Sequence, residues 1–271
     1  MAHFIAKKAH AVLKQALITG GSSGIGFALS KHFAKAGYTL LWVSENESQL
    51  RDAANVLRNN FPSTRVETLC VDLNELNSCD QVYSWALGFG GVDVLVNSAG
   101  FGTYGKLHET DLNAELRMIR LNVFATYKLT RLFADHMLQR GSGRIGNIAS
   151  NSILQPVPHM ATYAATKSFV YQFSRSLHEE LRYTGVAVTT VIPPATPGTG
   201  FQQAANMDGV RTFGGLLATS VDEVARLAYS AIMRGDRICY ASRKLRWTRP
   251  LAALLPHSII QKLIRWELGK A

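Results

Sequence analysis

The sequence contains few cysteines, and their placement excludes two classes of protein. Cys70, Cys79 and Cys239 are an odd number, at spacings that fit neither a disulfide framework nor a zinc site. We therefore expect reduced thiols in a cytoplasmic protein. The eight histidines do not pair with one another, with cysteine or with carboxylates at the spacing of metal ligands, so we expect no bound metal.

Long apolar runs are also missing. A membrane-spanning helix needs roughly 18 consecutive apolar residues, and the nearest candidate, Leu251–Ile264, is interrupted by Pro256 and Lys262. The amino end carries Lys7 and Lys8 where a secretion signal needs an apolar stretch. We expect neither a transmembrane helix nor export.

The net charge of +10 is concentrated at the two ends of the chain. Residues 1–14 contribute +3 and residues 242–271 contribute +6, which leaves about +1 for everything between them. A nucleic-acid-binding domain usually has a basic stripe on a recognisable motif, and none is present, so no nucleic-acid partner is expected. We predict a basic extension over 1–14, one domain over 15–241 with a substrate loop at about 194–220, and a basic, apolar tail over 242–271 packed on or beside the domain.

Short apolar runs alternate with longer patterns of helical period, without internal repeats or a flexible linker. Runs without strict polar alternation suit a parallel sheet that is covered by helices on both faces. We therefore predict a single α/β domain with a doubly wound, mainly parallel sheet. The expected strands are Ala16–Thr19, Thr39–Ser44, Val66–Val71, Val92–Val96, Arg144–Ala149 and Val186–Ile192, and the expected helices include Ile25–Ala36, Glu47–Asn59, Leu112–Gln139 and Tyr163–Tyr183.

A glycine-rich turn joins the first expected strand directly to the first expected helix. A turn of this kind lets backbone N–H groups approach a pyrophosphate, and the helix amino terminus adds partial positive charge. Glycine turns alone are weak signals, but the order strand, turn, helix favours a dinucleotide site. The candidate contacts are Gly20, Ser22, Ser23, Gly24, Ile25 and Gly26.

Three polar residues in the second half of the chain suit carbonyl chemistry. Tyr163 and Lys167 are four apart on an expected helix and share one face, where the ammonium group favours the phenolate. This would bring the pKa of Tyr163 from about 10 toward neutrality, so that it can protonate a reduced carbonyl oxygen. Ser150 closes the preceding strand and can hydrogen-bond the same oxygen. In isolation, a tyrosine packed beside a solvated lysine is the alternative interpretation.

Thr-Gly-x-x-x-Gly-x-Gly at residues 19–26, together with the thirteen-residue step from Ser150 to Tyr163, resembles the pattern of the short-chain dehydrogenases/reductases (SDR). The resemblance extends across most of the chain. It implies a Rossmann-like domain with strand order 3-2-1-4-5-6-7, and an NAD(P)-dependent oxidoreductase that acts on a ketone or alcohol.

The resemblance also implies a role for each catalytic candidate. Tyr163 would be the acid/base, and Lys167 would lower its pKa and bind the nicotinamide ribose. Ser150 would hold the substrate oxygen. Asn122 falls on the family's fourth member and would fix a water through which Lys167 reaches solvent.

Further cofactor contacts are implied after the third and fourth strands. The segment 97–100 is similar to the family's Asn-Asn-Ala-Gly element, with Ser98 as a mild departure. The implied contacts are Asp72, Leu73, Asn97, Ala99 and Gly100.

The choice between NAD and NADP depends on the end of the second strand. An acidic side chain there accepts a hydrogen bond from the ribose 2′-hydroxyl, whereas a basic one meets a 2′-phosphate. By resemblance the family's Asp falls on Ser44, and the Arg of phosphate binders falls on Glu45. Both markers are missing, and a carboxylate repels a phosphate, so NAD is weakly favoured and NADP stays open.

The segment after the sixth strand departs from the family. The family has Pro-Gly followed by a Thr near the nicotinamide, whereas Pro193 is followed here by Pro194. Proline fixes φ near roughly −65°, so the loop must take another path if the family glycine uses a positive φ. Thr199, rather than Thr196, is the expected nicotinamide contact.

Apolar residues after this loop and in the tail bear on the substrate. We expect a lipophilic acyl, steroid-like or polyketide substrate, bound by Phe201, Met207, Phe213, Leu216 and Leu217. The tail could lie on an anionic membrane, or could pack over the pocket or against another subunit of a homo-oligomer. An idle nicotinamide-binding scaffold and a peripheral membrane module are the alternative functions.

Overall fold

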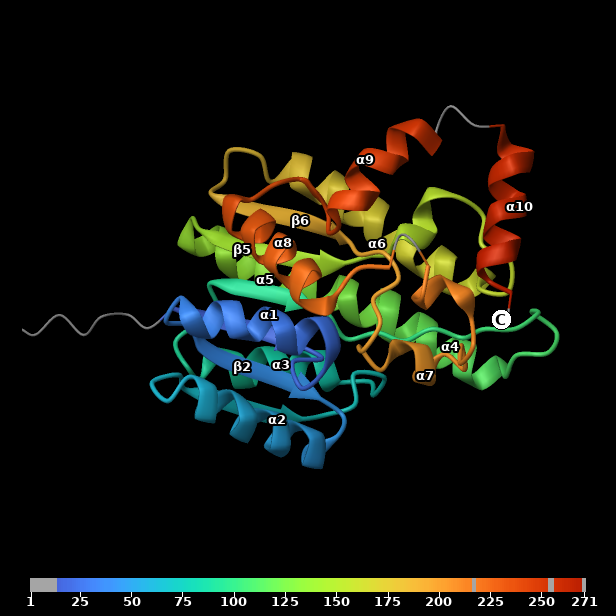
Figure 1. Ribbon diagram of the computed structural model, residues 1–271. Coiled ribbons are helices and arrows are strands. Elements are labelled where there is room, and N and C mark those ends of the chain that lie inside the picture. The colour runs from blue at the N-terminus through green and yellow to red at the C-terminus, as the bar shows by residue number, and fades with distance from the viewer. Residues whose placement is uncertain (1–13, 216–217, 253–255, 270–271) are drawn as a thin grey trace, which may run out of the picture.

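The computed structural model describes residues 14–215, 218–252 and 256–269. These residues form a seven-stranded parallel sheet of order β3-β2-β1-β4-β5-β6-β7 (Figure 1). The strands are β1 (Gln15–Thr19), β2 (Thr39–Ser44), β3 (Val66–Cys70), β4 (Val94–Asn97), β5 (Gly143–Ile148), β6 (Val186–Ile192) and β7 (Ile238–Tyr240).

Helices separate the strands and follow the last one. The α-helices are α1 (Gly24–Lys35), α2 (Glu47–Asn60), α3 (Ser78–Leu87), α4 (Leu112–Ile119), α5 (Thr126–Arg140), α6 (Ala161–Glu180), α7 (Phe201–Ala204), α8 (Val221–Arg234), α9 (Arg243–Ala252) and α10 (His257–Glu267). A π-helical segment, η1 (Arg120–Ala125), and two 3₁₀ turns, η2 (Asn151–Leu154) and η3 (Arg211–Phe213), complete the described chain.

Two hydrophobic cores cover the two faces of the sheet. Successive side chains of a strand point to opposite faces. Leu17 lies in one core with Phe133 of α5, whereas Ile18 lies in the other with Phe33 of α1. The core that contains Ile18 also joins α1 to α8, which lie side by side in Figure 1. Burial on both faces explains why these strands lack polar alternation.

The chain reverses direction across the sheet between β1 and β4. Thr19 is paired with Val43 of β2 on one side and with Asn97 of β4 on the other. The helix after β1 covers one face, and the helices after β4 cover the other. Such a reversal opens a crevice at the carboxyl ends of the strands, where open α/β sheets bind their ligands.

The predicted strands match the observed ones to within two residues, and the predicted sheet order is confirmed. The hydrophobic patterns assigned no residues to β7, which only the resemblance implied. Residues 112–139 were expected to form one regular helix, but η1 interrupts it between α4 and α5. The spacing of apolar residues along the sequence does not distinguish a π turn from an α turn, because both keep one face of the helix apolar.

The two ends of the chain differ in how much of them is described. The predicted extension 1–14 lies outside the described residues except for Lys14. In the described part of the tail, Ile264 of α10 lies in an apolar cluster with Met160 and Met207. Among the described residues, no helix has the length and apolar character needed to cross a membrane, and no group of side chains is arranged to hold a metal ion.

Candidate active site

The turn between β1 and α1 is built by close backbone contacts. Gly24 has a φ of +51°, and a Cβ there would lie 2.9 Å from the carbonyl oxygen of Thr199. A Cβ on Gly26 would collide with the carbonyl oxygen of Gly20, so only glycine lets α1 begin this close to β1. Ser23 caps α1 without a side-chain hydrogen bond, which leaves the first turn of the helix suited to an anion.

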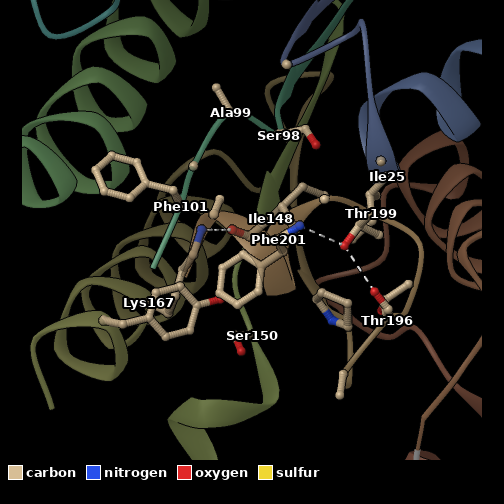
Figure 2. Close-up of a pocket in the computed structure, with 18 of the residues that line it drawn as sticks. Ile25, Ser98, Ala99, Phe101, Ile148, Ser150, Lys167, Thr196, Thr199 and Phe201 are labelled. Atoms are coloured by element: carbon tan, nitrogen blue, oxygen red, sulfur yellow. Dashed lines mark hydrogen bonds between the residues drawn. The ribbon is translucent and has the colours of Figure 1, made fainter. Parts of the chain in front are cut away.

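A cavity of about 690 Å³ runs from this turn across the carboxyl ends of the strands. Its size is that of a small-molecule or cofactor site. Figure 2 shows side chains from segments as far apart in the chain as Ile25 and Phe201 converging on it. The predicted site residues that line it are Gly20, Ser23, Gly24, Ile25, Ser44, Glu45, Asp72, Leu73, Ala99, Gly100, Ser150, Tyr163, Lys167, Pro193 and Thr199.

The other four predicted site residues do not line the cavity. Gly26 lies behind the turn. The Ser22 hydroxyl donates a hydrogen bond to the Ser44 hydroxyl at 3.2 Å. The Asn97 side-chain amide donates to Asn147 at 2.8 Å and so joins β4 to β5. These three residues support the cavity wall, and the fourth, Asn122, lies beneath the loop that follows β4.

The end of the cavity beside β2 and β3 holds two carboxylates and one cation. Glu45 and Asp72 line the cavity. A guanidinium nitrogen of Arg117, on α4, lies 3.8 Å from a Glu45 oxygen and 3.4 Å from an Asp72 oxygen. No sequence motif pointed to Arg117, because only the fold brings α4 to the ends of these strands. The three charges leave this end of the cavity net negative.

At the other end, Ser150, Tyr163 and Lys167 meet in one place. The Lys167 ammonium donates to the carbonyl oxygen of Ile148 at 3.0 Å and lies 5.9 Å from the centre of the Tyr163 ring. Ser150 hydrogen-bonds the Tyr163 side chain, and its hydroxyl also accepts from the backbone N–H of Ser152 at 3.2 Å. Figure 2 shows Lys167 reaching toward Ile148 within the cavity. This arrangement can bind a carbonyl oxygen and protonate it.

Burial shifts the pKa values of both groups. It raises the pKa of Tyr163 to about 12, against the lowering effect of the hydrogen bond with Ser150. It lowers the pKa of Lys167 to about 8. For Tyr163 the direction is opposite to the one predicted from the sequence, because removal of the phenolate from water outweighs the other effects. Tyr163 is therefore protonated at neutral pH.

Asn122 is fully buried in η1 and connects two walls of the site. Its amide donates to the Phe101 carbonyl oxygen at 2.9 Å and to the Thr166 hydroxyl at 3.1 Å. A Cβ on Gly100 would lie 2.8 Å from the Asn122 side-chain oxygen and 3.3 Å from the Lys167 ammonium nitrogen. Glycine at position 100 thus leaves room for both polar groups on the same side of the loop.

The loop after β6 closes the cavity above the glycine turn. Pro194 cannot take a positive φ, and here Gly198 and Gly200 adopt the left-handed conformation instead, with φ of +77° and +75°. Thr196 and Thr199 both line the cavity. The Thr199 hydroxyl donates to the carbonyl oxygen of Thr196 at 3.0 Å, so the two threonines stabilise one turn (Figure 2).

The remaining part of the cavity is mainly apolar. Phe201, Met207 and Phe213 line it as expected, whereas Leu216 and Leu217 lie outside the described residues. The tail contributes Ile264 from α10. Met160 also lines the cavity, and its position one helical turn before Tyr163 could have indicated this from the sequence. The lining residues that the sequence patterns did not single out include Phe101, Val157, Met160, Ala204, Thr212, Glu267 and Leu268.

Comparison with known sequences gives a consistent result. A family model described as short chain dehydrogenase matches residues 14–209. A very-long-chain 3-oxoacyl-CoA reductase of Rattus norvegicus is 36% identical over 182 residues, which are 66% of this chain and 58% of that protein. The chain therefore spans less than two thirds of that relative's length.

Two solved structures resemble the whole domain. A short-chain dehydrogenase from Sphingobium yanoikuyae, in complex with NADPH, superposes with a TM-score of 0.79 at 29% identity and covers 92% of this chain and 96% of that one. A bulky-bulky ketone specific alcohol dehydrogenase from Comamonas testosteroni superposes with a TM-score of 0.74 at 27% identity, covering 93% and 95%.

Proposed function

The chain belongs to the short-chain dehydrogenase family, and from that premise we propose that it transfers a hydride reversibly between a nicotinamide cofactor and a lipophilic ketone or secondary alcohol. The membership makes it an NAD(P)-dependent oxidoreductase acting on alcohol and ketone groups. The observation that carries the proposal is that Ser150, Tyr163 and Lys167 line the same cavity as the glycine turn.

NAD(P)H, when bound, supplies the hydride. As the carbonyl carbon is reduced, its oxygen gains negative charge and needs a proton. Tyr163 donates that proton, since burial raises its pKa to about 12 and keeps the phenol protonated. The Ser150 hydroxyl donates a hydrogen bond to the same oxygen and holds it in place. Alcohol oxidation runs these steps in reverse and requires Tyr163 to lose its proton first.

Lys167 acts on the phenolate that remains after proton donation. Burial lowers its pKa to about 8, so it is a cation at neutral pH and stabilises this phenolate. It also binds the nicotinamide ribose. Asn122 keeps the loop that follows β4 beside α6 and fixes a water through which Lys167 exchanges protons with solvent.

The glycine turn would hold the pyrophosphate of the cofactor, and residues at the ends of β2 and β3 would bind its adenosine. Glu45 and Asp72 make this end net negative even with Arg117 between them, which favours a ribose 2′-hydroxyl over a 2′-phosphate. We therefore propose a modest preference for NAD, although the Sphingobium yanoikuyae neighbour contains NADPH. The dissociation constants of NADH and NADPH test this preference, and tighter binding of NADPH would reject it.

Apolar side chains support a lipophilic substrate. Phe201, Met207, Phe213 and Ile264 line the cavity beyond Tyr163. The names of the very-long-chain 3-oxoacyl-CoA reductase and of the bulky-bulky ketone specific enzyme agree with this choice. Much higher kcat/KM for small polar ketones than for long apolar ones would contradict it.

The outer face of α10 supports contact with an anionic membrane. Ile259, Leu263 and Trp266 follow one another at helical spacing and are 44%, 54% and 61% exposed. Lys262 and Arg265 are exposed beside them. An apolar ridge flanked by bases suits the interface of an anionic bilayer. Sedimentation with anionic vesicles at low salt tests this contact, and no binding would dismiss it.

A second apolar face supports a homo-oligomer. Leu112, Leu116 and Ile119 form an exposed stripe along α4, and Phe124 and Tyr127 continue it. Exposed apolar patches of this kind mark interfaces. Analytical ultracentrifugation of the full chain and of Leu116→Asp tests the assembly. A monomer at every concentration would contradict it.

The central experiment is a screen of ketones and alcohols with both cofactors, followed at the nicotinamide absorbance. We expect reduction of bulky or long-chain ketones. If NAD(H) or NADP(H) binds tightly and no carbonyl compound is turned over, the protein is the idle nicotinamide-binding scaffold instead.

A further inference from the structure

One wall of the cavity comes from the far end of the chain. Ile264, Glu267 and Leu268, in and just after α10, line the same cavity as Tyr163. Hydrogen bonds to the domain hold this wall. Among them, the Tyr104 hydroxyl donates to the Leu268 carbonyl oxygen at 2.6 Å, and the Arg211 guanidinium donates to the Trp266 carbonyl oxygen at 3.0 Å. Figure 1 shows α10 at the same end of the molecule as α4 and α7. These hydrogen bonds hold the carboxyl end of α10 against the rest of the domain.

Glu267 is the exception in this wall. Its neighbours along the helix, Ile264 and Leu268, are buried in an apolar cluster with Met160 and Met207. The other carboxylates that line the cavity are Glu45 and Asp72, at the opposite end. Among the described residues, Glu267 is therefore the single acidic side chain in a mainly apolar part of the cavity.

Glu267 has no partner inside the described part of the protein. No hydrogen bond or ion pair joins its side chain to another described residue. The nearby cation, Arg211, is engaged elsewhere, since its guanidinium lies 5.3 Å from the centre of the Trp266 ring and donates to the Trp266 carbonyl oxygen. Glu267 is half-buried, and this burial raises the pKa of its carboxyl group because it withdraws part of the charged form from water.

We propose that Glu267 is a polar subsite at the substrate end of the cavity, which binds a hydroxyl or ammonium group of the substrate. This assignment rests on the proposed function and sharpens it. A partly desolvated carboxylate gains most from a donor that replaces its lost water, and most of all from a cationic one. The same carboxylate repels an anionic group. The substrate is thus an apolar ketone with a hydrogen-bond donor remote from the carbonyl, and not an acid.

A series of ketones that differ in one terminal group tests the subsite. Straight-chain methyl ketones of increasing length, each ending in methyl, hydroxyl, ammonium or carboxylate, are compared by kcat and KM at neutral pH. We expect the hydroxyl and ammonium members to have the higher kcat/KM at one chain length, by about tenfold over methyl, and the carboxylate member to be the poorest. The preference should appear mainly in KM, because Glu267 does not touch the reacting carbonyl.

Three variants separate charge from shape. Glu267→Gln keeps an acceptor oxygen and should lose the preference for ammonium while retaining part of that for hydroxyl. Glu267→Leu should lose both and favour the methyl member. Glu180→Gln, an exposed glutamate at the end of α6, is the matched control and should leave the ranking unchanged.

Failure of the subsite and failure of the proposed function give different results. Equal kcat/KM for the four terminal groups, or the same ranking in Glu267→Leu as in the parent, overturns the subsite while the hydride transfer stands. Absence of turnover with every ketone would reject the proposed function. In that case calorimetry with a medium-chain alkylammonium ion still decides on the subsite, since binding to the parent and not to Glu267→Leu supports it, and equal binding overturns it.

Discussion

The two ends of the cavity are built in different ways. The nucleotide end is built around the backbone of one short turn, where Gly20, Gly24 and Gly26 allow close approach of α1, β1 and the loop after β6. The substrate end consists of large side chains from segments far apart in the chain, including Phe101, Met207 and Ile264. The nucleotide end binds the cofactor, which is the same in every turnover, and the substrate end determines which carbonyl compound fits. Variants at the two ends should therefore change different kinetic constants.

Tyr163 lies where the two ends meet, and its replacement should have the largest effect. Tyr163→Phe removes the proton donor and keeps the ring, so kcat should fall by about a thousandfold for every ketone. The dissociation constant of the cofactor should change little. Tyr183→Phe, at a side chain that is 92% exposed, is the control. Substantial turnover by Tyr163→Phe would refute its role.

Gly26→Val should damage the nucleotide end alone. The new Cβ would collide with the Gly20 carbonyl oxygen and push α1 away from β1. The affinity for the cofactor should therefore fall by about a hundredfold, and turnover at a fixed cofactor concentration should fall by the same factor for every ketone. Fluorescence titration measures the affinity, and thermal unfolding monitors the fold. Gly214→Ala, where the nearest atom lies 3.8 Å from the new Cβ, should bind as the parent does. Parent-like affinity in a folded Gly26→Val would show that the close approach is not needed.

The pH profile tests the chemistry between the two ends. Lys167 is cationic below its pKa of about 8 and neutral above it. If the cation assists proton donation by Tyr163, kcat/KM for reduction should be constant below this pH and fall by about tenfold per pH unit above it. Lys167→Met should be slow at all pH values and lack this decline, while Lys35→Met, at an exposed position on α1, keeps it. A decline that persists in Lys167→Met belongs to another group.

The smallest effect is expected at the substrate end. Met207→Ala removes an apolar side chain from the cavity and should raise KM for long-chain ketones several-fold, with little change for small ones or in cofactor affinity. Met233→Ala, at a partly buried side chain that packs against the core containing Phe33 of α1, is the control for loss of stability. If Met207→Ala weakened cofactor binding as much as ketone binding, the division of the cavity into two ends would be wrong.

Much of the nucleotide end was predictable because its residues act locally. The turn at residues 19–26 needs glycine at fixed offsets for steric reasons, and every such constraint is visible in the sequence. Tyr163 and Lys167 are likewise one helical turn apart. Arg117 was not predictable, since its relation to Glu45 and Asp72 depends on where α4 lies against the strands.

The electrostatic state of the site also escaped prediction. The spacing of Tyr163 and Lys167 suggested a lowered phenol pKa, but the degree of burial determines the direction, and burial is a property of the folded chain. The π turn at Asn122 and the left-handed residues Gly198 and Gly200 are similar cases. Hydrophobic period gave no sign of the π turn, and the identity of Pro194 indicated that its loop departs from the family pattern but not the form of that departure.

The order of strands and helices and the glycine turn followed from the sequence alone, because hydrophobic period and backbone sterics act between residues that are near one another in the chain; the pairing of Tyr163 with Ser150 followed from the family pattern. Tertiary structure alone decided that α10 closes the substrate end, that Glu267 stands there without a partner among the described residues, and how strongly Tyr163 and Lys167 are withdrawn from water. Burial and long-range contact depend on how whole elements pack, and no local pattern of residues encodes them.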